Sequence, residues 1–210
     1  MDTIAAAALH EHASGLLERS AAYMLGRLAT VTPSMLGAPT PCRDWDLGML
    51  LHHLADSLTA LAEALGSGVL TLEAPGGGEA GPGRRDVLAS EEGPADRPVR
   101  TVRAATARLL GAWTAAGHPD IAIAGHPLHA AVVGATGALE IAVHGWDIAR
   151  ATGRPRPIPP ALAGRLLRLA PLAVTAGTRD GLFAPPLPVP DGAGPAARLL
   201  AHLGREPDAA

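Results

Sequence analysis

A glutamate and a histidine, Glu140 and His144, lie four residues apart in a stretch of the sequence that is otherwise almost entirely apolar. If this stretch is a helix, both side chains share one face, about 5–6 Å apart. A buried carboxylate is costly unless it is paired or bound to a metal ion. The two residues therefore call for a third partner that brings a metal, although a buried Glu–His ion pair would also explain the pattern.

A further histidine lies inside the apolar stripe of another predicted helix. His53 follows the helical spacing of the leucines around it, whereas its neighbour His52 falls off this stripe and is expected to face outward. Two histidines and a glutamate that leave one coordination position open are a known ligand set for catalytic zinc. We therefore predict a divalent metal site, with zinc as the expected ion, at His53, Glu140 and His144.

Residues near this ligand set are candidates for supporting roles. Asp147 lies on nearly the same helix face as His144 and could hold the imidazole in place, although pairing with Arg150 or another arginine is the interpretation we favour. Arg150 could bind an anionic substrate, or simply complement the helix dipole. Trp146 could form a pocket wall or pack in the core. The single cysteine, Cys42, is expected to be a small buried filler.

The elements that must position these residues are predicted to be helices, because alanine and leucine dominate the apolar residues and few residues are aromatic. We expect either Asp44 or Asp46 to cap the second helix and Gly117 to end the third. The first four helices are long enough for an all-α four-helix bundle, in which metal ligands come from facing helices. Apolar residues recur at helical spacing over 3–30, 46–66, 98–117, 129–152, 160–177 and 194–203.

The connections between these helices differ in composition. Residues 32–44 contain three prolines and are predicted to be extended, not helical. Residues 67–97 are rich in glycine and proline and are predicted to be a flexible surface loop. Residues 120–129 alternate in polarity and permit a short extended piece or a hairpin. We expect residues 1–178 to form the bundle and the proline-rich residues 179–210 to pack on it, as an extension that is not an independent domain.

Composition excludes several classes of partner. The net charge is −3 and there is no basic block, so a nucleic-acid partner is not expected. No apolar run reaches the ~20 residues that a membrane helix needs. One cysteine cannot form an internal disulfide, which is typical of a reducing compartment. We therefore expect a cytoplasmic protein that binds small molecules, and the sequence leaves a homodimer open.

Two segments resemble the DinB-like family that includes mycothiol-dependent maleylpyruvate isomerase. Residues 40–54 are similar to the entry to the family's metal helix, where a tryptophan precedes the first ligand histidine by eight residues, as Trp45 precedes His53. Residues 140–153 look like the signature that supplies the glutamate and the second histidine. The resemblance implies a DinB-like bundle with a C-terminal helix and a proline-rich tail, a divalent metal, and mycothiol as cosubstrate.

The isomerases of this family carry an additional C-terminal α/β domain, and too few residues follow the predicted fifth helix here to form one. The maleylpyruvate activity is therefore not carried over. A divalent cation with an open position strongly lowers the pKa of a thiol, which is near 8.5 when free. The sequence hypothesis is a thiol S-transferase or isomerase in which the metal activates the thiolate for attack on a small electrophilic metabolite.

Three alternatives stay open at this point. The bundle could use a metal-activated water as a hydrolase or isomerase. It could hold a small ligand without catalysis. It could also catalyse a metal-independent step in natural-product biosynthesis. Because one fold supports many functions, the fold alone does not separate these readings.

Overall fold

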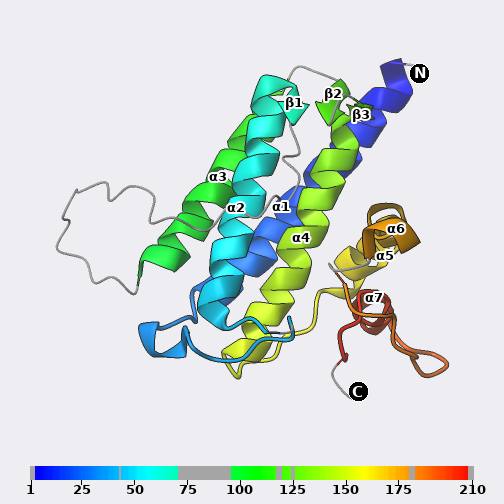
Figure 1. Cartoon of the computed structure of the whole chain (residues 1–210). Coiled ribbons are helices and arrows are strands. Elements are labelled where there is room, and N and C mark those ends of the chain that lie inside the picture. Colours follow the sequence, from blue (N-terminus) through cyan, green and yellow to red (C-terminus); the bar gives the residue numbers. More distant parts are fainter. Residues whose placement is uncertain are drawn as a thin grey trace.

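The computed structural model describes residues 3–42, 44–70, 96–116, 120–123, 126–179 and 183–207. Within these ranges the chain is mainly helical, which confirms the all-α prediction. Four long helices form the bundle (Figure 1): α1 (Thr3–Leu28), α2 (Leu47–Ser67), α3 (Arg97–Ala115) and α4 (Ala130–Ala151). Helix α1 packs along α4, α2 packs along α3, and α2 also contacts α4. The ends of these helices lie within two residues of those that the apolar spacing predicted.

Helix α2 begins where its cap requires. The Oδ1 atom of Asp46 accepts a hydrogen bond from the backbone N–H of Met49 at 2.8 Å, so Asp46 is the cap. Asp44, the other candidate, lies in the preceding connector with φ 63°. The helix ends at Gly68, whose φ of 71° is a left-handed conformation that glycine adopts without strain. This start places His53 in the second turn of α2, next to the connector. Gly117 lies outside the described residues.

The connector before α2 is not wholly extended. Its prolines were predicted to exclude a helix, yet Pro33–Met35 form a short 3-10 helix, η1. A proline at the first position of a helix needs no N–H donor there, which explains why this turn tolerates Pro33. After Met35 the chain turns back, and the backbone N–H groups of Leu47 and Gly48 donate to the carbonyls of Ala38 and Leu36. These bonds hold the connector against the first turn of α2.

A small three-stranded sheet lies at the end of the bundle where α2 finishes (Figure 1). Strands β2 (Asp120–Ile123) and β3 (His126–His129) pair antiparallel, which confirms the hairpin predicted for residues 120–129. Strand β1 (Val69–Leu70) pairs parallel with β2. The first residues of the predicted 67–97 loop are therefore helix and strand, and residues 71–95 lie outside the described part of the chain.

The C-terminal part adds three shorter helices beside α4 (Figure 1): α5 (Pro160–Ala173), α6 (Ala176–Arg179) and α7 (Pro195–His202). Helix α5 packs against α7, α4 and α1. It ends earlier than the predicted residue 177, because Pro171 lies in its last turn and has no N–H to continue the hydrogen-bond ladder. Leu172, in the last turn of α5, is exposed. Residues 183–194 form neither helix nor strand, and they turn at Asp191 and Gly192 before α7 begins.

The core is built from leucine and alanine of all four long helices. The predicted stripe of α2 is buried at Leu50, Leu54, Leu58 and Leu65, while Met49 at its edge is half exposed. Within the described residues, no helix is long and apolar enough to cross a membrane. The stripe thus turns the ligand-bearing face of α2 toward α4.

Candidate metal centre

The three predicted metal ligands meet between α2 and α4. The Nε2 atom of His53 lies 3.0 Å from Oε1 of Glu140, and Nε2 of His144 lies 3.3 Å from the same oxygen. The two imidazole rings stand nearly perpendicular, with centroids 5.3 Å apart. The structure therefore brings together one atom from each residue, all within 4.8 Å of one another. We call His53, Glu140 and His144 the donor cluster.

The donor cluster is graded in exposure. The side chain of His53 is 37% exposed, that of Glu140 24% and that of His144 8%. All three line an open cavity of about 820 Å³. His52, by contrast, is 79% exposed and pairs with Asp56 at 2.9 Å. The two adjacent histidines thus differ as the apolar stripe predicted, with only His53 turned to the site.

The donor cluster fits a divalent cation. Zinc binds histidine nitrogen and carboxylate oxygen at roughly 2.0–2.2 Å, so neighbouring ligands of a tetrahedral ion are roughly 3.4 Å apart. The 3.0 and 3.3 Å separations found here are close to that value. They are also hydrogen-bond distances, so the ion pair that the sequence left open would use the same side chains. The donor types and the opening to the cavity favour the metal.

The electrostatics of the donor cluster hold its carboxylate ionised. Burial by itself raises the pKa of Glu140, but the charge of His144, and then its hydrogen bond and that of His53, bring it well below its ordinary value of 4.5. Burial by itself lowers the pKa of His144, but the charge of Glu140 and the hydrogen bond to Asp147 raise it well above 6.5. The metal-free cluster therefore favours a proton at the position that a cation would take.

A buried ion pair lies behind His144, on the side away from Glu140. The Oδ2 atom of the fully buried Asp147 lies 2.9 Å from Nδ1 of His144. Arg205, from the segment after α7, donates from Nε to Oδ1 of Asp147 at 2.9 Å and from Nη2 to Oδ2 at 2.8 Å. Burial by itself raises the pKa of Asp147, but the charge of Arg205 and the hydrogen bonds lower it to about 2. Asp147 thus pairs with an arginine, as we favoured, but with Arg205 and not Arg150.

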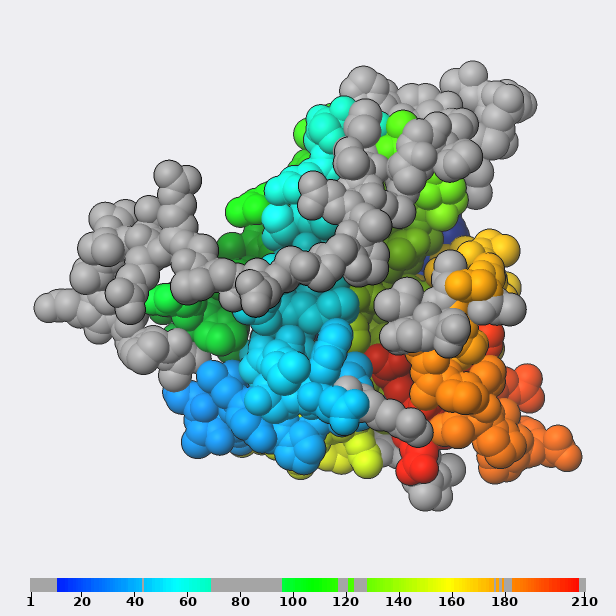
Figure 2. Space-filling model, viewed as in Figure 1, coloured from blue at the N-terminus to red at the C-terminus, as the bar shows by residue number. Residues whose placement is uncertain are grey.

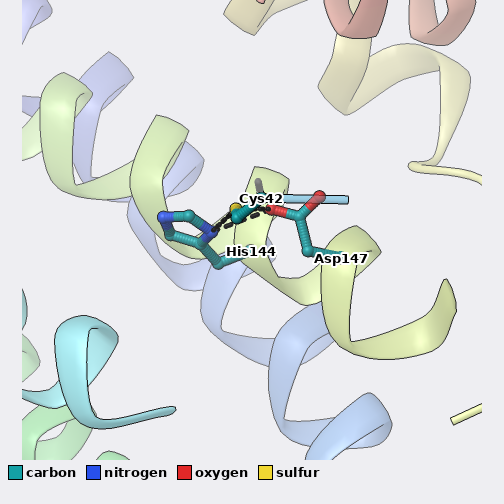
Figure 3. A group of neighbouring side chains, drawn as sticks. All are labelled: Cys42, His144 and Asp147. Carbon is teal, nitrogen blue, oxygen red and sulfur yellow. Dashed lines mark hydrogen bonds and ion pairs between the residues drawn. The ribbon is translucent and has the colours of Figure 1, made fainter. Parts of the chain in front are cut away.

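Cys42 lies beside this buried ion pair. Its thiol lies 3.4 Å from Oδ2 of Asp147, to which it can donate, and its sulfur accepts from Nη2 of Arg205 at 3.3 Å. The sulfur also lies 3.9 Å from Nδ1 of His144. Figure 3 shows that Cys42 and Asp147 approach the same ring nitrogen, while the other nitrogen points away from them. We call Cys42, Asp147 and Arg205 the rear group.

The rear group is neither a catalytic triad nor a convincing cation site. In a triad, the nucleophile and the orienting carboxylate contact opposite nitrogens of the histidine. Here both lie at Nδ1 of His144. Cys42, His144 and Asp147 do form a possible donor set, but the Asp147 carboxylate is already occupied by the Arg205 guanidinium. A cation there would meet a positive charge, so the front donor cluster is the better site.

Two residues predicted to bind substrate do not reach the cavity. Trp146 is buried, and Arg150 lies over its ring at 5.8 Å from the centroid. Neither lines the cavity. The reason is helix geometry: each residue turns about 100°, so positions 146 and 150 lie roughly 200° and 240° around α4 from His144. Packing, the alternative that the sequence left open for Trp146, is the role that these contacts support. Substrate binding by Trp146 or Arg150 stays a prediction.

Residues from three parts of the chain surround the cavity. Helix α4 adds Leu139 and Val143, the connector adds Trp45, and the C-terminal part adds Val174, Phe183 and Leu203. Figure 2 shows this arrangement from outside, with the blue-to-cyan connector and α2 on one side of α4 and the orange-to-red C-terminal segment on the other. Sequence reasoning placed residues 179–210 against the bundle, but it missed that this segment forms a cavity wall and carries Arg205, because helical spacing does not say which side chains meet the site.

Comparison with known proteins finds a family match, which covers most of the bundle. The family described as mycothiol maleylpyruvate isomerase N-terminal domain matches residues 17–149. The match includes all three members of the donor cluster and Asp147, and it ends before the C-terminal helices. No curated protein and no solved structure matches the chain.

Proposed function

Since the chain belongs to the mycothiol maleylpyruvate isomerase N-terminal domain family, we propose that it is a metal-dependent enzyme that joins a low-molecular-weight thiol to a small electrophilic metabolite. Mycothiol is the expected thiol and zinc the expected ion. The proposal includes an isomerase, in which the thiol adds to the substrate and later leaves. The observation that carries it is the donor cluster, which opens on a cavity of ligand size.

The donor cluster would supply three protein ligands and leave a position toward the cavity. His53 and His144 would bind through Nε2, and Glu140 through Oε1, since these atoms already face one another. A divalent cation held there would lower the pKa of a thiol that reaches it and favour the thiolate at neutral pH. Three protein ligands with one open position are typical of catalytic rather than structural sites.

The cavity supports a small, largely apolar electrophile. Its volume of about 820 Å³ lies within the range of roughly 300–1,000 Å³ that ligand pockets occupy. Apolar side chains such as Leu139, Val143 and Phe183 form much of its wall and would exclude water from the reacting atoms. The proposed reaction is balanced: the thiol loses its proton, its sulfur bonds to an electrophilic carbon, and the acceptor takes up a proton.

Metal content tests the first half of the proposal. The purified protein should carry close to one equivalent of divalent metal, and His53→Ala or His144→Ala should abolish it. His52→Ala is the matched control, because this neighbouring histidine faces solvent and should leave the metal content unchanged. Wild-type protein that binds no added Zn²⁺, or equal metal content in all variants, would reject the metal site.

Thiol dependence tests the second half. Mycothiol and a generic electrophile, such as an enone or an epoxide, should react faster with the protein than without it, and a chelator should remove the difference. Added Zn²⁺ should restore the rate. A rate that ignores the chelator would reject the role of the metal, and turnover of the electrophile without any thiol would favour metal-activated water instead.

A further inference from the structure

The buried ion pair behind His144 joins the C-terminal segment to the donor cluster. Arg205 makes two-point contact with Asp147, and Asp147 in turn meets Nδ1 of His144. Arg205 and Asp147 are 58 positions apart, and Arg205 lies beyond the residues that the family matches. Through Arg205 the segment after α7 thus reaches back to the ligand-bearing helix α4.

The local backbone is shaped to present Arg205. Gly204 has φ 75°, and a Cβ atom there would lie 2.6 Å from the carbonyl oxygen of Ala184, so glycine is required at this turn. Arg179 braces the same turn, because its guanidinium donates to the carbonyls of Ala184 at 2.7 Å and His202 at 2.9 Å. These contacts fix the direction in which the chain leaves α7.

We propose that Arg205 is a positioning residue that, through Asp147, fixes the ring of His144 so that Nε2 faces the donor cluster. An ionised carboxylate accepts hydrogen bonds but cannot donate them. With Arg205 paired to Asp147, the ring must therefore carry its proton on Nδ1. In a neutral ring the lone pair then lies on Nε2, which faces Glu140. Partners of this kind commonly set the orientation of metal-binding histidines.

This inference rests on the proposed metal site for its functional meaning, but its physical content is the orientation of the His144 ring and the proton on Nδ1, which do not depend on metal. The C-terminal segment becomes part of the site's construction, as well as a wall of the cavity. A purely structural ion pair would stabilise the fold and leave the donor cluster unaffected. The two readings differ in whether the effect of Arg205 passes through Asp147 to His144.

A double-mutant cycle separates these readings. The affinity for Zn²⁺ is measured by competition with a chromophoric chelator in wild type, Arg205→Met, Asp147→Asn and the double variant. We expect Arg205→Met to weaken Zn²⁺ binding about 10- to 100-fold. In the Asp147→Asn background the same change should alter affinity less than about twofold, because the ionised carboxylate through which Arg205 acts on His144 is already gone. Equal effects in both backgrounds would overturn the proposal.

Two further variants keep the cycle interpretable. Arg198→Met is the matched control, because Arg198 lies exposed in α7 of the same segment and should leave Zn²⁺ affinity unchanged. Arg205→Lys keeps the positive charge but cannot reproduce the two-point contact, so it should restore only part of the affinity. If Arg205→Met does not fold, Arg205→Lys and the double variant still carry the test. Full affinity in Arg205→Lys would show that charge alone suffices and would overturn the positioning role.

The position of the proton on the His144 ring can be measured directly by NMR in the metal-free protein. With ¹⁵N-labelled histidine, the His144 signals are assigned by their loss in His144→Gln. In wild type, Nδ1 should stay protonated from neutral to alkaline pH, whereas Arg205→Met should populate the Nε2–H form. A neutral wild-type ring that carries its proton on Nε2 and none on Nδ1 would refute the proposal. If wild-type protein binds no Zn²⁺ while Nδ1 stays protonated, the proposed enzymatic function fails and the positioning by Arg205 stands.

Discussion

The two sides of the His144 ring are built on opposite principles. At Nε2, the donor cluster is partly exposed, borders the cavity and has atoms from two helices facing one another across a small gap. At Nδ1, Cys42 and Arg205 also border the cavity, but the carboxylate of Asp147 is fully buried and is saturated by Arg205, His144 and the Cys42 thiol. One imidazole thus joins a side that can accept a ligand to a side that cannot.

This difference shows why similar residue types need not do similar chemistry. Both sides offer a carboxylate and a second donor to the same histidine. Only the front lacks a fixed cation, whereas Arg205 already supplies one at the rear. A divalent ion is attracted to the side where negative charge is uncompensated. The rear group therefore holds His144 in place, whereas the donor cluster is the side that can bind a cation.

The largest effect should come from breaking the rear group. Arg205→Met leaves the carboxylate of Asp147 buried without its main partner, which typically costs about 3–5 kcal/mol of stability. We expect a loss of this size in the free energy of unfolding of the metal-free protein, measured by urea denaturation. Arg198→Met should change it by less than about 0.5 kcal/mol. A loss below about 1 kcal/mol in Arg205→Met would show that water reaches the carboxylate of Asp147 once Arg205 is removed.

Breaking the front should instead cost metal affinity. His53→Ala removes one of three predicted ligands, and we expect Zn²⁺ binding to weaken at least about 100-fold, which is about 2.7 kcal/mol. His53 is partly exposed, so the free energy of unfolding of the metal-free protein should change by less than about 1 kcal/mol. Chelator competition and urea denaturation measure the two quantities on the same samples. If His53→Ala loses stability but keeps its metal, then His53 stabilises the fold and is not a metal ligand.

The pH dependence of the metal-free protein should show both sides. In the folded protein the pKa of His144 is raised above its ordinary 6.5. Its contribution to the free energy of unfolding is therefore fully present below about pH 6.5 and is lost as pH rises through the folded pKa. The pKa of Asp147 is lowered from 3.8 to about 2, so its contribution is present above 3.8 and is lost as pH falls through about 2. The acid loss corresponds to about 2 kcal/mol. Glu140, with its lowered pKa, adds to the acid side.

We therefore expect the free energy of unfolding to be highest between about pH 4 and 6.5 and to fall on either side. Glu140→Gln should flatten the alkaline fall, because the charge of Glu140 contributes most to raising the pKa of His144. Excess Zn²⁺ should extend the stable range to higher pH, because the cation replaces a proton at the donor cluster. A metal-free protein whose stability rises steadily from pH 6 to 9 would contradict this account of the front.

The donor cluster could be predicted from the sequence because its three residues lie on helices with regular apolar spacing. His53, Glu140 and His144 are polar residues at positions that the apolar spacing of α2 and α4 assigns to the core. Their residue types together with these positions indicated a metal site. The bundle itself followed from the same spacing. Trp146 and Arg150 lie on other sides of α4 than His144, because each residue turns the helix by about 100°.

The rear could not be predicted in this way. Arg205 lies in a polar Gly-Arg-Glu-Pro tail, where an arginine is ordinarily exposed to solvent, and its partner is 58 positions away. Cys42 lies in a proline-rich connector without helical periodicity. Asp147 was the one visible sign, since a buried carboxylate requires a partner that the sequence does not name. The choice of Arg205 depends on tertiary contacts of the C-terminal segment alone.

The smallest effect should come from Cys42, and it sharpens the comparison. The thiol only supplements an ion pair that is complete without it, so Cys42→Ala should lower the free energy of unfolding by about 1 kcal/mol or less. It should leave the Zn²⁺ stoichiometry unchanged, because its sulfur lies at Nδ1 and not at the donor cluster. Denaturation and metal analysis of this variant measure both. Loss of bound Zn²⁺ would mean that the ion sits on the Nδ1 side, where Cys42, His144 and Asp147 would then be its ligands.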